Sequence, residues 1–303
     1  MDSIILIFVC MLAGVGLQRV KAFPPNAYVA LNQFVIYISL PGLALYYIPK
    51  IEASIKLLYP LGVAWVGFLL AFIFFVVLGK IFGWSRKLTG CLILTGGLGN
   101  TSFVGFPVIE ALYGKEGLET AIIVDQPGTF VVMATLGIIV AAAYSKGATG
   151  TAAMAKKILF FPPFIAFFLG VCMNTFNYDF ITDVQSVLLR LGNTVTPVAL
   201  VAVGMQLKID VKSKHWSFLA LGLFFKLILM PAFFFVLYKV FLKGQGIETE
   251  VSIMEAAMAP MITASILASS HGLKPRLSGM MVGVGIPLSF ITLALWYWLL
   301  YNY

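Results

Sequence analysis

The sequence predicts an all-α polytopic membrane protein of about ten transmembrane helices, arranged as two inverted five-helix repeats with crossed, broken helices 4 and 9. Of its 303 residues, 61% are hydrophobic and only 11% are charged, and the mean hydropathy is +1.00. A soluble domain carries about 25% charged residues. Apolar stretches of about 20 residues, the length that spans a bilayer core, recur along the whole chain. Helix-breaking residues also recur at matching places in the two halves.

Apolar runs between charged or Pro/Asn-rich breaks mark the expected spans. The first run is followed, not preceded, by basic residues (Arg19 and Lys21), so we interpret it as a retained span and not as a cleaved signal peptide. The expected spans lie near residues 3–18, 28–48, 57–79, 88–112, 121–144, 158–176, 186–207, 216–242, 251–270 and 277–301.

The basic residues between these spans indicate the orientation in the membrane. The odd-numbered loops hold 13 Lys and Arg residues and the even-numbered loops hold 6. By the positive-inside rule, the odd loops face the cytoplasm, and both termini are expected outside the cell membrane, extracellular or periplasmic. The same rule accounts for the net charge of +8, so we expect no nucleic-acid partner. The three cysteines form no CxxC pair, and the two histidines lie near loops, so no metal and no cofactor is expected.

The two halves, residues 1–145 and 155–303, share a pattern of helix breakers. A half with an odd number of spans can repeat only in inverted orientation across the membrane, as in many transporters. The matching breakers are Asn32 and Pro41 in span 2 against Asn193 and Pro197 in span 7, and Pro127 in span 5 against Pro287 in span 10.

The most unusual segment is GGLGNTSFVGFPVIEALYG, residues 96–114, whose midpoint in span 4 falls near Thr101. Span 9, EAAMAPMITASILASSHG, has Pro260 at its centre. Gly costs about 1 kcal/mol and Pro about 3 kcal/mol in a helix interior, and unwound backbone in a membrane is tolerated only inside protein or beside water. A matched pair of breaks therefore predicts a transporter site, whose helix N-termini suit an anion; kinks that serve only packing are the alternative. The expected substrate-binding residues are Asn100, Thr101, Ser102, Pro107, Pro260, Thr263 and Lys226.

Ionisable residues inside a span are functional candidates. Lys226 lies near the centre of span 8, and its candidate partners are Asp125 in span 5 and Glu255 in span 9. Asp125 and Lys226 are interpreted either as a proton-coupling pair or as a permanent structural ion pair, and Lys226 alternatively holds a substrate carboxylate. For Glu255 the second interpretation is a sodium ligand. The residues expected to bind the coupling ion, a proton or sodium, are Asp125, Gln126 and Glu255.

Four segments carry a family resemblance: ALNQFVIYISLPGLALYYIPK, GGLGNTSFVGFPVIEALYGKEGLETAIIVDQPG, TPVALVAVGMQL and EAAMAPMITASILASSHGL. Together they resemble the auxin efflux carrier family, whose bacterial members are described as organic-acid permeases and which is related to the bile acid–sodium symporters. The resemblance implies a sodium/proton antiporter-like fold and a homodimer. It also implies a scaffold domain of residues 1–50 plus 156–208 and a core transport domain of residues 55–145 plus 214–303. Asn32 and Asn193 are expected either to line the cavity from the scaffold side or to form interhelical hydrogen bonds.

The expected function is secondary active transport of small organic anions such as carboxylates or auxin-like acids, by alternating access of the elevator type. Coupling to protons or to the membrane potential is the first hypothesis, and a sodium-coupled symporter of the bile acid type is the alternative. The partners are then the substrate, the coupling ion and the lipid bilayer. An intramembrane enzyme is a different class, disfavoured because the spans contain no HExxH, no paired catalytic aspartates and no Ser/His arrangement. A passive channel is distinguished by whether substrate accumulates against its gradient.

Overall fold

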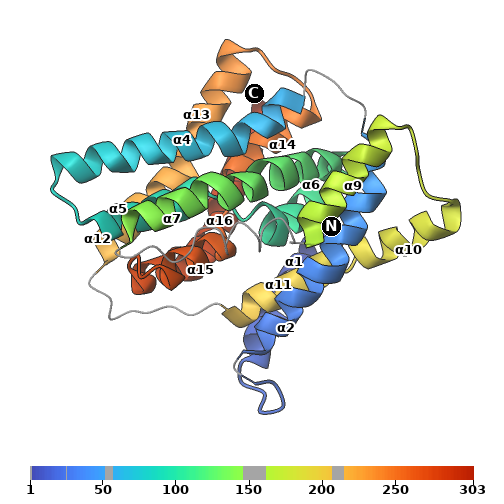
Figure 1. The fold of residues 1–303 in the computed structure, drawn as a ribbon, viewed down its shortest axis with the longest axis horizontal. Helices are drawn as coiled ribbons and strands as arrows, with labels where there is room; N and C mark the ends of the chain where they lie inside the picture. Colours follow the sequence, from blue (N-terminus) through green and yellow to red (C-terminus); the bar gives the residue numbers. More distant parts are fainter. Residues whose placement is uncertain (1, 25, 52–56, 146–161, 207–214) are drawn as a thin grey trace. The chain divides into compact units, whose positions relative to one another are not determined.

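The computed structural model describes the chain except residues 1, 25, 52–56, 146–161 and 207–214. The described residues form helices and their connections (Figure 1). Within these described ranges, six helices are long and apolar enough to cross a membrane, in agreement with a polytopic membrane protein. Ten spans and an inverted repeat remain predictions. These six run over Ala27–Lys50, Leu58–Ile81, Thr101–Tyr144, Thr182–Gln206, Trp216–Phe241 and Pro275–Asn302.

The chain divides into two compact units, which are described separately. Unit 1 contains residues 1–55, 102–122 and 156–207, and unit 2 contains residues 56–101, 123–155 and 208–303. Residues 102–122 thus pack with unit 1, although the sequence places them in the expected core domain. The division into a scaffold and a transport domain stays a prediction.

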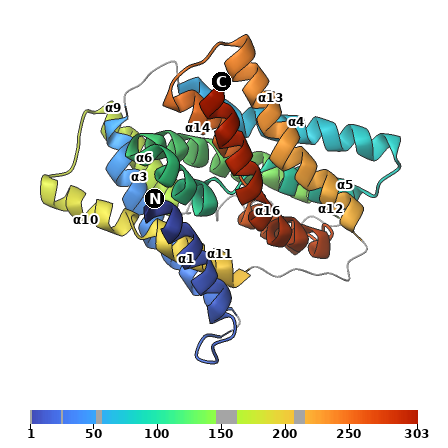
Figure 2. The same ribbon diagram turned by 180° about the vertical axis from the view of Figure 1, so that it is seen from behind.

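In unit 1, two helices approach each other closely through glycine. Gly14 on α1 faces α11, where a Cβ would collide with the carbonyl oxygen of Val201, and Gly204 on α11 meets the carbonyl of Met11 in the same way. The two helices lie side by side in both views (Figures 1 and 2). The helices of this unit are α1 (Asp2–Leu17), α2 (Ala27–Phe34), η1 (Val35–Ser39), α3 (Leu40–Tyr47), η2 (Ile48–Lys50), α6 (Phe106–Ile123), α9 (Pro162–Thr175), α10 (Thr182–Gly192) and α11 (Val195–Gln206).

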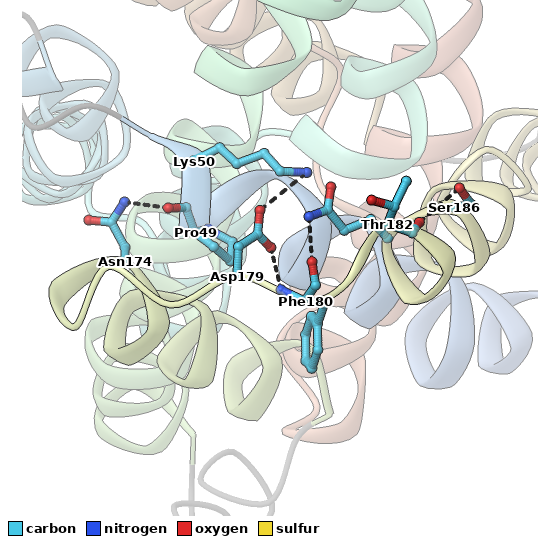
Figure 3. Close-up of polar contacts among 8 residues, drawn as sticks. Pro49, Lys50, Asn174, Asp179, Phe180, Thr182 and Ser186 are labelled. Carbon is cyan, nitrogen blue, oxygen red and sulfur yellow. Dashed lines mark hydrogen bonds and ion pairs between the residues drawn. The ribbon is translucent and has the colours of Figure 1, made fainter.

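Polar side chains fix the helix ends of unit 1. Asn174 near the end of α9 donates to the carbonyl of Pro49 at 2.9 Å, and Lys50 pairs with Asp179 at 3.8 Å (Figure 3). Deeper in the unit, the hydroxyls of Ser39 and Thr194 are hydrogen-bonded at 2.7 Å. These contacts tie segments of the first half of the chain to segments of the second half.

In unit 2, the residues around the ends of α5 and α14 form the centre of the core. Every residue of this unit from 88 to 101 and from 251 to 262 is buried. The elements of this unit are α4 (Leu58–Ile81), α5 (Arg86–Gly97), η5 (Val124–Phe130), η6 (Met133–Gly137), α7 (Ile138–Tyr144), α12 (Trp216–Phe224), η7 (Phe225–Leu229), α13 (Met230–Phe235), η8 (Val236–Phe241), α14 (Ile247–Ala256), α15 (Ile262–Ser270) and α16 (Pro275–Asn302). A short π-helical segment, η4 (Thr101–Gly105), joins the break after α5 to α6.

Several of these spans contain π-helical turns, which are rare and are often found at functional sites. The turn η5 contains Asp125, Gln126 and Pro127, and the turn η7 contains Lys226. The ionisable residues that the sequence singles out in spans 5 and 8 therefore both lie where the regular α-helical pattern is interrupted. The sequence offers Pro127 as a cause in η5, because proline lacks the N–H that an α-helix uses.

Candidate functional site

The two broken helices of unit 2 meet at their breaks. Helix α5 ends at Gly97 and α14 ends at Ala256, and between the helical segments Gly99 and Pro260 form an antiparallel bridge. The N–H of Asn100 donates to the carbonyl of Ala259 at 2.7 Å, and the N–H of Met261 donates to Leu98 at 2.9 Å. Each break thus satisfies backbone groups of the other, as unwound backbone inside a membrane requires. Proline is tolerated because the bridge uses the carbonyl of Ala259 and the N–H of Met261, and needs no N–H from Pro260 itself.

Glycines let the end of α5 approach α4 closely. A Cβ on Gly96 would come within 2.7 Å of the Phe75 ring, and one on Gly97 would lie 3.0 Å from both Phe68 and Ala71. These contacts are too tight for a side chain, so the same residues that weaken the helix are needed for packing. The interruption lies at residues 98–100 and so includes Asn100, the first residue of the Asn-Thr-Ser run on which the prediction was centred.

The carboxylate of Asp125 lies at the first break. The hydroxyl of Thr101 donates to one of its oxygens at 2.6 Å, and the side-chain amide of Gln126 donates to the other at 2.8 Å. All three side chains are buried. Because both carboxylate oxygens accept hydrogen bonds, this group is held in a defined orientation beside Thr101.

The ammonium of Lys226 lies at the second break. Its Nζ atom donates to the carbonyl of Ala256, the last residue of α14, at 2.8 Å and lies 3.4 Å from the sulfur of Met230. The side chain is only 1% exposed. The sequence proposes Asp125 and Glu255 as its partners. In the described part of the chain, however, the atoms that contact the ammonium belong to a carbonyl and a thioether.

Glu255 occupies the last turn of α14 and is completely buried. Neither of its carboxylate oxygens has a hydrogen-bond partner among the described residues, although the group interacts electrostatically with Asp125 and Lys226. The side-chain nitrogen of Asn100 and the side-chain oxygen of Gln126 likewise lack a hydrogen-bond partner within the described ranges. Buried polar atoms are nearly always paired in native proteins. These atoms therefore have unused capacity for a ligand, an ion, a proton or water.

Helix α15 begins at the same crossing, directly after the second break. Its N-cap residue, Met261, makes no side-chain capping hydrogen bond. The first N–H groups of a helix have no partner inside the helix, and this end carries a partial positive charge. Thr263, which the sequence predicts as a substrate ligand, is half-buried in this first turn.

The other predicted site residues belong to unit 1. Ser102 and Pro107 are buried, Asn32 is half-buried with an unpaired side-chain oxygen, and Asn193 is exposed at the C-cap of α10. Their roles stay predictions.

Sequence reasoning missed Gly99, Ala256 and Met230, which contact or closely approach the Lys226 ammonium. Gly99 lies in the glycine-rich run and could have been found there. The backbone carbonyl of Ala256 leaves no signal in the residue type.

The fold and the site define a class: a polytopic helical membrane protein whose buried polar groups collect where two interrupted helices cross. The family model described as membrane transport protein matches residues 1–297, and the chain belongs to this family, the auxin efflux carriers. The resemblance carried by the four sequence segments is thereby confirmed.

Two archaeal relatives cover nearly the whole chain. An uncharacterized transporter of Methanocaldococcus jannaschii is 28% identical over 313 aligned positions, and the alignment covers 100% of this chain and 99% of the relative. An uncharacterized transporter of Methanothermobacter thermautotrophicus is 26% identical over 305 residues, covering 97% of this chain and 96% of the relative. The chain is thus a membrane transporter embedded in a lipid bilayer.

Proposed function

We propose that the protein is a secondary active transporter of small organic anions, carboxylates above all, which bind at the crossing of the two broken helices in unit 2. The observation that carries this proposal is the mutual pairing of the two breaks, with an unpaired Asn100 amide beside it and an uncapped start of α15. Amide donors and a helix N-terminus are groups that bind carboxylates.

The buried charges support coupling to a cation. Asp125 and Glu255 bring two carboxyl groups, and Lys226 brings one ammonium. If all three were ionised, one negative charge would stay uncompensated in a buried environment, which is costly. A single proton or a monovalent cation restores neutrality. We propose a proton, carried by the carboxyl pair, and the membrane potential as the driving forces for alternating access of the elevator type.

Sodium is the second candidate for the coupling ion. Glu255, Asn100, Thr101 and Gln126 supply oxygen atoms, two of which belong to the unpaired Glu255 carboxylate. Unwound backbone and helix C-termini at such breaks coordinate Na⁺ in other transporters. Transport that responds to a sodium gradient and not to a pH gradient would favour this candidate.

The test is uptake by the purified protein reconstituted in liposomes. A thermal-shift screen against mono- and dicarboxylates, with and without Na⁺ and across pH, first selects a labelled substrate. Accumulation against its gradient, driven by an imposed pH gradient or potential, is expected; equilibration alone would show a passive channel.

Asn100→Leu removes a donor to a charged ligand, which is worth about 1.5–3 kcal/mol, so uptake should fall about 10- to 100-fold. Pro260→Ala should also abolish uptake by letting the chain continue as helix, with protein abundance retained. Asn302→Leu, an exposed asparagine at the end of α16, is the control. Unchanged uptake by Asn100→Leu would show that the crossing is not the substrate site.

A further inference from the structure

We propose that the ammonium of Lys226 is a built-in cation, which permanently fills a monovalent-cation position between the ends of the two interrupted helices. Truncating this side chain should open the position to an external monovalent cation such as Na⁺ or methylammonium. The inference concerns the crossing proposed above as the transport site, and it assigns to Lys226 a role other than binding the substrate.

The position lies where two helix C-termini meet. Helix α5 ends at Gly97 and α14 ends at Ala256, and the bridge between Gly99 and Pro260 holds these ends together. Each helix C-terminus carries about half a negative elementary charge and carbonyl groups without intrahelical partners. The Nζ atom of Lys226, 2.8 Å from the carbonyl of Ala256, therefore occupies the place where a cation is favoured.

The position is also compact. Gly99 has no side chain, and a Cβ placed there would come within 3.1 Å of the Lys226 Nζ atom and 3.5 Å of the carbonyl oxygen of Glu255. A side chain at this point of the first break would crowd the ammonium and force it to shift. A lysine head group is a small point charge, which among the side chains is the nearest equivalent of a monovalent ion.

The unpaired Glu255 carboxylate supplies the countercharge. It interacts electrostatically with Lys226, while its oxygens have no hydrogen-bond partner in the described segments. The ammonium has three donors, one of which meets Ala256 and another of which faces the sulfur of Met230, a weak acceptor. Its contribution at this place is therefore mainly its charge, which a free ion could replace.

The two kinds of helix end at the crossing, the C-termini of α5 and α14 and the N-terminus of α15, therefore have different roles. The C-terminal side holds a cation that is covalently attached to the chain, while the start of α15, which has no side-chain cap, is the end that suits an anion. The natural protein should then need no external cation at this position. A sodium ion on Glu255 would have to share the carboxylate with the ammonium.

The experiment measures thermal unfolding of the purified full-length protein by tryptophan fluorescence in choline, sodium or methylammonium chloride at equal ionic strength. The unaltered protein should unfold at one temperature in all three salts. Lys226→Ala leaves the buried Glu255 carboxylate without its positive countercharge, so the Tm of this variant should fall by about 10 °C in choline chloride. Saturable recovery of at least half of that loss by Na⁺ or methylammonium is expected.

Two variants control for the effect of truncation. Lys226→Met fills the position with an uncharged chain, so it should lose stability without recovery by either cation. Lys239→Met removes another lysine from the same long helix, one that pairs with Glu250 at 3.4 Å, and should show no cation-specific recovery. Equal Tm values of Lys226→Ala in the three salts, or a sodium response of the unaltered protein, would overturn the proposal.

If Lys226→Ala does not fold, the proposal is tested with the double variant Lys226→Met/Glu255→Gln. Because it removes both charges, it should be more stable than Lys226→Met alone; equal or lower stability would refute the proposal. None of these measurements needs a substrate. Cation-specific recovery in a protein that transports nothing would support the built-in cation and reject only the proposed function.

Discussion

Two buried carboxylates of unit 2, Asp125 and Glu255, differ in how they are held. Asp125 accepts hydrogen bonds from Thr101 and Gln126, one on each oxygen. Glu255, at the end of α14, has no hydrogen-bond partner for either oxygen within the described part of the chain. The first carboxylate is therefore fixed as part of the first break, whereas the second has unused acceptor capacity. This difference makes Glu255 the better candidate for the group that exchanges a proton or binds an ion.

The largest expected effect comes from neutralising the two carboxylates separately. Glu255→Gln should abolish the stimulation of uptake by an imposed pH gradient, because the exchangeable proton has lost its acceptor. Asp125→Asn should lower the rate of uptake but keep part of the stimulation. Both are measured in liposomes, with Glu250→Gln on the same helix as the control. If Asp125→Asn alone abolishes the stimulation, Asp125 and not Glu255 is the better candidate for the group that exchanges the proton.

A smaller effect is expected from releasing Asp125. Thr101→Val keeps the shape of the side chain but removes the donor at 2.6 Å. A hydrogen bond to a charged group contributes about 1.5–3 kcal/mol, so Tm should fall by about 5 °C. Thr135→Val, which removes only a hydroxyl bonded to the carbonyl of its own helix, is the control. An unchanged Tm for Thr101→Val would show that Asp125 is not held by this contact.

The smallest effect concerns the second break, which is held by packing. A Cβ on Gly285 of α16 would come within 2.7 Å of the Pro260 ring and 2.9 Å of Leu223. Overpacking costs about 1–3 kcal/mol, so Gly285→Ala should lower Tm by about 3 °C or more. Gly279 on the same helix has no atom within 4 Å of such a Cβ. Gly279→Ala should therefore leave Tm unchanged or raise it, and equal behaviour of the two variants would contradict the packing argument.

The class of protein and both breaks could be predicted from the sequence, for reasons that lie in the residues themselves. Gly96, Gly97 and Gly99 weaken the helix of span 4, and Pro260 cannot continue the helix of span 9. The association of Asp125 with the first break was predicted only in part. Its place in span 5 suggested a site, but its bonds to Thr101 and Gln126 depend on the π-helical turn in which it lies.

The partner of Lys226 could not be predicted. Sequence reasoning pairs a buried ammonium with a carboxylate, because only ionisable side chains are visible as charges. The atom that accepts its hydrogen bond is the backbone carbonyl of Ala256, which any residue would offer. The grouping of residues 102–122 with unit 1 was not predicted either, because it depends on contacts distant in the chain.

The π-helical turn η7 has a consequence for comparing this chain with its relatives. A π-turn arises when one residue is inserted into an α-helix, and the turn at Phe225–Leu229 contains Lys226 and offers the carbonyl of Leu227 to the indole of Trp296 at 3.0 Å. Deleting one residue there would rotate everything beyond it by about 100° around the helix axis. An alignment that closes a one-residue gap elsewhere in this helix would therefore assign the lysine to the wrong face, even if every other column were correct.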